Sequence, residues 1–328
     1  MFDIYGGEVL VFGDLHFSDV FTGRHKDYLV NCAKVLSQIE TIIKERKPSA
    51  VVFAGDLVGW SETNIKSRQV LSMFCGFWRR INEISEVFAV RGNHDIKGYP
   101  DFNLLEELGY IKTPRYFDFY RNKDVDIPDI RFHIVNYGNE HEILDLLDGE
   151  TTNVVIGHNN YTIAGYTTWY QKHDGIEVSS LENYTGVSLI VSGHIHKPSP
   201  ELYGTTMSDG SNCNLYYVGC PTRPVQEDYD DVRVATFTAT DDSVDFDVLN
   251  MELQPHEELY YSSEEVFEDT TEEELAESVR KEALAEVLGD IIKYRMLGGD
   301  IMSQVDAIPN ASDDAKNMCK NYLKIAMR

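Results

Sequence analysis

Five short apolar runs recur over about the first 200 residues, and Asp, Asn or His follows each run within three residues. The runs are four or five residues long and rich in Val, Ile and Phe, which is typical of buried strands. In an open α/β sheet, ligands bind beyond the carboxyl ends of the strands, so we expect the five loops to meet in one crevice. The runs are Glu8–Phe12, Ala50–Ala54, Val87–Val90, Asn153–Ile156 and Val187–Val191.

Two longer segments carry the apolar period of a helix. Residues 28–47 place Leu, Ile and Cys on one face and stop before Pro48, which predicts a crossover helix between the first two strands. Residues 62–84 have a wide apolar surface. That surface fits either a fully buried helix or a contact between two subunits.

Further strands are predicted in two groups. Residues 116–120 and 131–135 flank a polar turn, and His133 alternates with apolar neighbours, so we interpret it as a structural histidine. The second group is expected to complete a second sheet, and it comprises residues 215–218, 232–237 and 244–248.

The composition changes past about residue 255. A capping box at Thr271–Glu274 predicts a helix to about Leu297, and residues 313–327 form a second amphipathic pattern. We therefore divide the chain into a domain of residues 1–254 and an acidic helical region of residues 255–328. The apolar faces of that region fit either a partner protein or packing on the chain's own core.

The 328 residues include 55 acidic and 29 basic side chains, and the formal net charge is −26. Five scattered cysteines, without a Cys-x-x-Cys pair, are typical of reduced thiols. No export signal and no membrane-spanning apolar stretch is recognisable in the sequence. These features indicate a cytoplasmic protein without a membrane partner.

The residues that follow the five runs are potential metal ligands. Carboxylate, imidazole and amide oxygen together suit a pair of divalent cations of the Mn, Fe or Zn type. Taken singly, each residue is more often a helix cap, a turn residue or a core histidine than a metal ligand, and only the joint order of the motifs favours a metal site. The motifs are Asp14-Leu15-His16, Gly55-Asp56, Gly92-Asn93-His94-Asp95, Gly157-His158 and Gly193-His194-Ile195-His196.

This order of motifs resembles that of the calcineurin-like metallophosphoesterases. The resemblance implies a four-layer α/β/β/α sandwich with a small C-terminal helical appendage, and a centre of two divalent ions, here taken as Mn²⁺. It also implies the ligand sets. One ion would be held by Asp14, His16, Asp56 and His196, and the other by the bridging Asp56 with Asn93, His158 and His194.

Three further residues, which are neighbours of the implied ligands in the sequence, are candidates for catalysis or substrate binding. By resemblance, His94 contacts the phosphate or protonates the leaving oxygen, which a histidine can do near neutral pH. Asp95 is expected to orient His94, with a turn-closing or capping carboxylate as the equal alternative. Arg91 is a candidate phosphate contact, although a structural salt bridge is the favoured interpretation.

The segments Leu10–Phe17 and Tyr217–Thr222 look like those of SbcD-type double-strand-break repair exonucleases, including phage recombination nucleases of similar size. This resemblance implies a DNA exonuclease that is also an endonuclease on hairpins or single strands when its SMC-like ATPase is present. It further implies a homodimer through residues 62–84 and ATPase docking through residues 255–328. A phage member would act in the cytoplasm of its bacterial host.

Net charge is the main objection to DNA as the substrate. A free DNA-binding protein usually carries a basic face that releases counterions from the phosphates, whereas this chain is strongly acidic. A partner that supplies affinity would answer the objection. The alternatives are a phosphomonoesterase or cyclic-nucleotide phosphodiesterase with the same site, and a non-catalytic scaffold.

Overall fold

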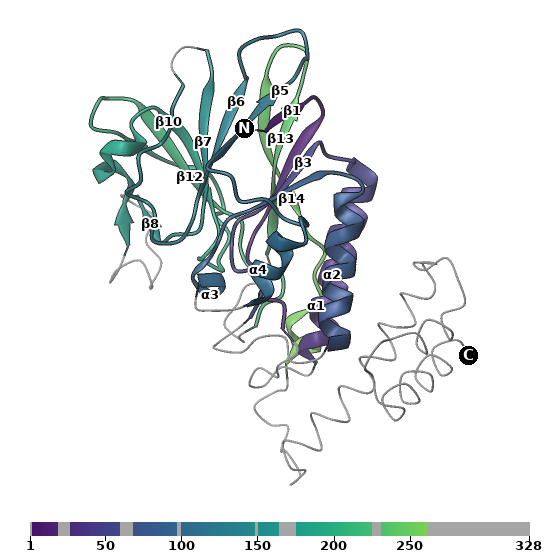
Figure 1. The fold of residues 1–328 in the computed structure, drawn as a ribbon. Helices are drawn as coiled ribbons and strands as arrows, with labels where there is room; N and C mark the ends of the chain where they lie inside the picture. The colour runs from purple at the N-terminus through teal and green to yellow at the C-terminus, as the bar shows by residue number, and fades with distance from the viewer. Residues whose placement is uncertain are drawn as a thin grey trace, which may run out of the picture.

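Two β-sheets pack face to face in the computed structural model (Figure 1). The structure describes residues 2–18, 27–59, 68–96, 100–147, 150–163, 175–224 and 231–260. In spatial order, the seven-stranded sheet comprises β1 (Asp3–Tyr5), β5 (Tyr116–Tyr120), β6 (Ile130–Val135), β7 (Thr152–Gly157), β10 (Val187–Ser192), β12 (Asn212–Tyr217) and β11 (Tyr203–Thr206). The five-stranded sheet comprises β14 (Val244–Asn250), β13 (Arg233–Ala239), β2 (Glu8–Phe12), β3 (Ala50–Phe53) and β4 (Glu86–Ala89).

Strand β2 shows why these apolar runs form the centre of the fold. Val9 and Val11 point into the layer between the two sheets, whereas Leu10 and Phe12 point into the layer between the sheet and the helices. Successive side chains of a strand face opposite sides, so a strand that is covered on both sides must be apolar at every position. The five apolar runs are confirmed as β2, β3, β4, β7 and β10.

Helices cover the outer face of the five-stranded sheet (Figure 1). Helix α1 (Tyr28–Arg46) confirms the expected crossover helix, and α2 (Arg68–Asn82) confirms the described part of the second. The side chain of Asp27 caps α1 by accepting the backbone N–H of Val30 at 3.0 Å. Shorter helices are α3 (Asn93–Ile96), α4 (Pro100–Glu107) and α6 (His256–Leu259).

The outer face of the seven-stranded sheet is covered differently. Here the described cover consists of the 3₁₀ turns Val178–Ser180 and Glu182–Tyr184 and the small sheet of β8 (Tyr161–Thr162) and β9 (Ile176–Glu177). The four-layer α/β/β/α class is therefore confirmed as a mixed α/β sandwich, with few helices in its second outer layer. The predicted C-terminal helical appendage lies outside the described residues.

The last predicted strand group is divided between the sheets, which corrects one expectation. Strand β12 pairs with β10 in the seven-stranded sheet. Strand β13 instead pairs antiparallel with β2 in the five-stranded sheet, and β14 pairs with β13 at its edge. Apolar periodicity predicts which face of a strand is buried but says nothing about its pairing partner. None of the described helices is both long and apolar enough to cross a lipid bilayer.

Register brings the loops together. Phe12 pairs with Phe53 and Phe53 with Ala89, so the three parallel strands β2, β3 and β4 end side by side. In the other sheet, Gly157 at the end of β7 pairs with Ser192 at the end of β10. The five motif loops therefore leave the same edge of the sandwich, three from one sheet and two from the other.

Trp78 provides a test of the packing that supports this edge. Its ring is fully buried on α2 and lies 4.7 Å from the Phe53 ring at the end of β3. Its Nε1 has no hydrogen-bond partner among the described residues. We expect Trp78→Ala to lower the free energy of unfolding by about 3–5 kcal/mol, whereas Trp78→Phe should cost less than half as much. If chemical denaturation gives the same loss of unfolding free energy for both variants, the contact between Trp78 and Phe53 does not support this edge of the sandwich.

Candidate metal centre

The structure brings all seven potential ligands into one cluster. Asp14 and His16 follow β2, Asp56 follows β3, Asn93 opens α3 after β4, His158 follows β7, and His194 and His196 follow β10. Asp14, His16, Asp56 and His158 are buried, whereas Asn93, His194 and His196 are partly exposed.

One half of the cluster is formed around His16. Its Nε2 lies 3.1 Å from Nε2 of His196, close enough for the two rings to share one ion. The same nitrogen lies 3.6 Å from Oδ2 of Asp56 and 3.9 Å from Oδ1 of Asp14. This half joins the four residues that the resemblance assigns to the first ion.

The other half is formed around the amide oxygen of Asn93. That Oδ1 lies 3.1 Å from Nε2 of His158 and 2.9 Å from Nδ1 of His194. Nε2 of His158 is also 3.1 Å from Oδ2 of Asp56. The same Asp56 oxygen therefore faces both halves, which is the position required of a bridging ligand.

Backbone carbonyls fix the orientation of two imidazole rings. Nδ1 of His158 lies 2.6 Å from the carbonyl oxygen of Ala54, and Nδ1 of His16 lies 2.8 Å from that of Gly59. With Nδ1–H donated to a carbonyl, the Nε2 lone pair is directed into the cluster, as in metal-binding histidines generally.

The loops adopt backbone conformations that ordinary residues rarely take. His16, Asp56 and His194 all have positive φ, at 43°, 49° and 76°. Such conformations cost of order 1–3 kcal/mol each and persist where the surrounding structure determines them. We interpret them as the strain that turns these side chains inward at the strand ends.

Burial of several ionisable groups dominates the electrostatics. Burial raises the pKa of the Asp14 carboxyl and lowers that of His16. Burial alone would also raise the pKa of Asp56, but His158, His16 and His94 hold it well below its usual range. Burial opposes protonation of His158, yet Asp56 and Asp14 raise its pKa to about 9. Cations are the natural partners of carboxylates that are removed from water.

The residues present fit two divalent ions. Six residues that offer carboxylate, imidazole or amide donors surround the carboxylate of Asp56 from two sides, and Asp56 itself is the seventh. This donor set suits Mn²⁺, Fe²⁺ or Zn²⁺ and does not choose among them.

His94 occupies the mouth of the cluster. Its backbone N–H donates to Oδ1 of Asp56 at 2.8 Å, and its ring Nε2 lies 4.0 Å from Oδ2 of the same residue. The side chain remains 20% exposed, in contrast to the fully buried rings of His16 and His158. His94 is thus placed to meet a substrate from solvent.

The Asp95 carboxylate closes the turn between two loops, which is one of the two alternatives that the sequence left open. It accepts the backbone N–H groups of Gly92 at 2.9 Å, of Leu57 at 3.1 Å and of Val58 at 3.4 Å. These bonds are those of the turn-closing alternative, and they tie the Asp56 loop to the Asn93 loop. Burial, followed by the charge of Asp56, raises the pKa of Asp95 to about 8.

Arg91 points away from the cluster toward α4. Its guanidinium pairs with Glu106, donates to Oδ1 of Asn103 at 2.7 Å and lies 4.4 Å from the centre of the Phe102 ring. This is the structural salt bridge that was favoured from the sequence.

Two residues near the centre were missed by the sequence analysis. Tyr137, in the loop after β6, places its ring centre 5.5 Å from that of His194. Its only sequence signal is that it follows a strand that ends at the same edge as β7. The thiol of Cys220, with the ring nitrogens of His16 and His196, forms a group of atoms within 4.8 Å of one another.

Tyr161 is one of several aromatic residues between His158 and His194 in the sequence. That ring is fully buried, and its hydroxyl lies 2.9 Å from that of Tyr184, so it packs in the core. Tyr166, Trp169 and Tyr170 lie outside the described residues.

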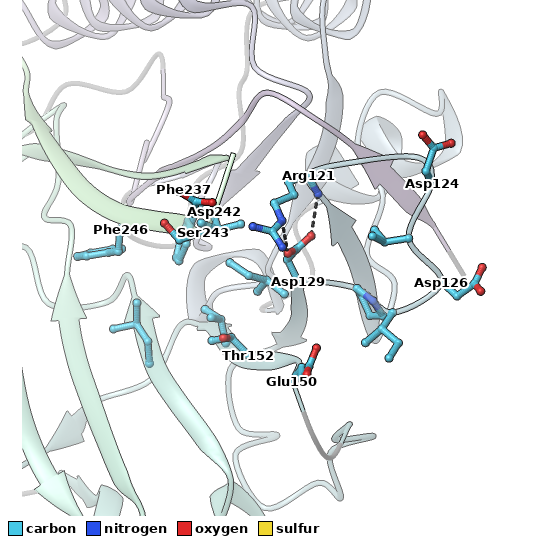
Figure 2. A pocket seen from close by; sticks show the side chains of 17 residues that line it. Arg121, Asp124, Asp126, Asp129, Glu150, Thr152, Phe237, Asp242, Ser243 and Phe246 are labelled. Carbon is cyan, nitrogen blue, oxygen red and sulfur yellow. Dashed lines mark hydrogen bonds and ion pairs between the residues drawn. The ribbon is translucent and has the colours of Figure 1, made fainter. Parts of the chain in front are cut away.

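A cavity of about 710 Å³ opens at the other edge of the sandwich (Figure 2). It is lined by the first residues of β6 and β7 and by the β13–β14 turn, whereas the motif loops follow the last residues of their strands. Figure 2 shows Arg121 held against Asp129, with Nε and Oδ1 2.9 Å apart. The cavity is therefore separate from the candidate centre.

Comparison with known proteins adds a family match. The family model described as calcineurin-like phosphoesterase matches residues 7–198. A dimetal phosphatase from Danio rerio is similar in structure, with a TM-score of 0.48 and 12% identity over 76% of this chain and 99% of that one. The protein TT1561 of Thermus thermophilus gives a TM-score of 0.39 and 9% identity over 70% of this chain and 93% of that one. None of the curated proteins matches the chain.

Gly92 allows a test of the Asp56 position. A Cβ at residue 92 would lie less than 3.0 Å from both the carboxylate and the backbone nitrogen of Asp56. We expect Gly92→Ala to displace Asp56 and to weaken Mn²⁺ binding at least about tenfold in calorimetry. Gly76→Ala on α2 is the matched control, because a Cβ there meets only the end of the flexible Arg80 side chain. Unchanged Mn²⁺ affinity in a folded Gly92→Ala protein would exclude this role.

His133 provides a pH test away from the centre. Burial lowers its pKa from 6.5 to about 4, while Nε2 lies 3.3 Å from Oδ1 of Asn153. Between these values the unfolded chain binds a proton that the folded chain does not, so stability falls as pH decreases from 6.5 to 4. The unfolding free energy should therefore fall between pH 7 and pH 4.5 in the wild type. We expect this fall to be roughly 2 kcal/mol smaller in His133→Gln. The same pH dependence in both proteins would show that this histidine is not responsible.

Proposed function

Because the chain belongs to the calcineurin-like phosphoesterase family, we propose that its metal centre hydrolyses the phosphodiester bonds of DNA. The chain is a phosphoesterase-type, metal-dependent hydrolase, and the nuclease activity is the proposed refinement. The proposal rests above all on the cluster of seven potential ligands centred on Asp56, with the partly exposed His94 beside it.

Each group of the centre would have a distinct task. When bound, two divalent cations would lower the pKa of a shared water and stabilise charge on the attacking and leaving oxygens. The buried histidines and carboxylates would hold these ions and exclude bulk water. His94, whose ring reaches solvent, would donate a proton from Nε2 to the leaving oxygen.

Two segments support DNA as the substrate. The nuclease-like segments Leu10–Phe17 and Tyr217–Thr222 lie against each other at the centre: the hydroxyl of Thr222 donates to the carbonyl oxygen of Leu15 at 2.7 Å. Gly13 approaches Gly219 so closely that a Cβ would clash with its carbonyl oxygen. The resemblance therefore concerns two segments that contact each other, and one of them carries Asp14 and His16.

The acidic composition favours a second candidate, a phosphatase or cyclic-nucleotide phosphodiesterase. With a net charge of −26, long-range attraction of a polyanion is weak, and a small substrate depends on it less. In the nuclease proposal, an SMC-like ATPase supplies the missing affinity and docks on residues 255–328, which lie outside the described residues apart from 255–260. Mn²⁺ as the native metal and a homodimer through α2 belong to the same proposal.

Cleavage assays decide between these functions. Labelled duplex and hairpin DNA, a chromogenic phosphomonoester and a cyclic nucleotide are each incubated with the full chain and Mn²⁺ or Mg²⁺. We expect DNA to be degraded and the small substrates to turn over poorly. Efficient turnover of the small substrates with intact DNA would establish the phosphatase or cyclic-nucleotide alternative.

Two variants test the assigned roles in the same assay. Asp56→Asn should abolish cleavage and weaken metal binding, whereas Asp209→Asn, in an exposed turn, is the matched control and should keep both. His94→Gln should lower kcat by about 10²–10⁴-fold with metal binding retained, because it removes a proton donor and no ligand. Full activity of either Asp56→Asn or His94→Gln would contradict the mechanism.

A further inference from the structure

We propose that Tyr137 forms a nucleobase-binding subsite beside the metal centre. This inference deepens the proposed function, because it names the part of a nucleic-acid substrate that the centre recognises. Tyr137 follows β6, and its ring centre lies 5.5 Å from that of His194 and 6.4 Å from that of His158. The residue is nevertheless 39% exposed, so one part of the ring faces the centre and another faces solvent.

Hydrogen bonds on both sides fix the position of Tyr137. Its backbone N–H donates to the carbonyl oxygen of Arg91 at 2.9 Å, and the N–H of Arg91 donates back to Oδ1 of Asn136 at 2.8 Å. The N–H of Gly138 donates to Oδ1 of the buried Asn159 at 3.1 Å. Both anchors adjoin motif residues, since Arg91 precedes Gly92-Asn93 and Asn159 follows His158. The backbone that carries the ring is therefore anchored beside the second half of the metal cluster.

A fixed aromatic surface at this point suits a nucleobase. A base stacks on an aromatic side chain through its π face, with a contribution of about 1–3 kcal/mol and little dependence on sequence. A tyrosine has only two side-chain torsions, so a ring on an anchored backbone loses little conformational entropy when a base covers it. A phosphate at the metal centre would bring the attached nucleoside to within reach of a ring only 5.5 Å from a ligand residue.

The charge of the chain increases the importance of such a contact. Most proteins gain affinity for nucleic acids by neutralising phosphates with Lys and Arg, an interaction that this acidic chain provides poorly. Stacking does not depend on net charge. Among the described residues with exposed large apolar side chains, Tyr137 is the aromatic whose ring contacts histidines of the centre.

The competing explanation is that Tyr137 shields His194 from water. A shielding ring would stabilise the metal-bound centre regardless of what the substrate carries. A base-binding ring would instead distinguish a nucleotide from the same sugar phosphate without its base. The two roles therefore differ in a measurable quantity, the ratio of two dissociation constants.

The experiment compares binding of deoxyadenosine 5′-monophosphate and deoxyribose 5-phosphate to the full chain in Mn²⁺, by calorimetry. We expect the wild type to bind the nucleotide about 5–100-fold more tightly than the sugar phosphate. Tyr137→Ala should reduce this ratio to near one, and Tyr137→Trp should retain it. Tyr5→Ala is the matched control, because Tyr5 is 40% exposed and stacks on Tyr120, and it should leave the ratio unchanged.

Three results would overturn the subsite: a ratio near one in the wild type, a ratio that survives in Tyr137→Ala, or weaker Mn²⁺ binding in that variant with the ratio unchanged. The last result would establish shielding of His194. Binding does not require DNA cleavage, so the subsite and the nuclease function fail separately. If the protein prefers the nucleotide strongly over the sugar phosphate but leaves DNA intact, the base subsite is supported and the nuclease function is excluded.

Discussion

One oxygen of the Asp56 carboxylate faces both halves of the metal cluster, while the other accepts the backbone N–H of His94. Much of the surrounding structure serves to keep this group in place. The Asp56 backbone has positive φ, and Gly92 leaves the space that its side chain occupies. The parallel register of β2, β3 and β4 brings the neighbouring loops to the same edge. Small displacements of Asp56 would therefore separate the two halves of the centre.

Burial of charge explains why the centre needs so much support. Asp14, Asp56 and Asp95 are all buried within one group of loops, and isolated carboxylates in such surroundings are costly. Asp95 satisfies its oxygens with backbone N–H groups and thereby joins two loops. Asp14 accepts the N–H of His194 at 2.9 Å and thereby joins the two sheets. Asp14 and Asp95 thus have two effects. Their buried negative charge favours cation binding, and their hydrogen bonds hold the loops that carry the potential metal ligands.

The sequence predicted the strands, and the meeting of the candidate ligands at one edge, for a specific reason. Runs such as Val51–Phe53 are apolar on both faces, and a potential ligand follows each run, so both signals are local. Strand pairing is not a local property: nothing in residues 233–239 indicates that they pair with β2 in the five-stranded sheet. The sequence could not decide between the two roles of Asp95 either, because the Leu57 N–H group that it binds lies 38 residues away in the chain. Tyr137 carried no motif, and only the fold places it beside His194.

The position of the centre also bears on the conflict between acidic composition and a polyanionic substrate. Net charge acts over a range of about 10 Å at ordinary ionic strength, whereas contacts at the centre act at a few ångströms. Two bound dications would reverse the local potential around Asp14 and Asp56, even though the chain as a whole carries −26. Repulsion would then slow the approach of nucleic acid without preventing hydrolysis of a phosphate that has reached the ions. If the substrate is the proposed nucleic acid, an acidic chain with this centre would depend on short-range contacts or on a partner for substrate capture, and its chemistry would not require a basic surface.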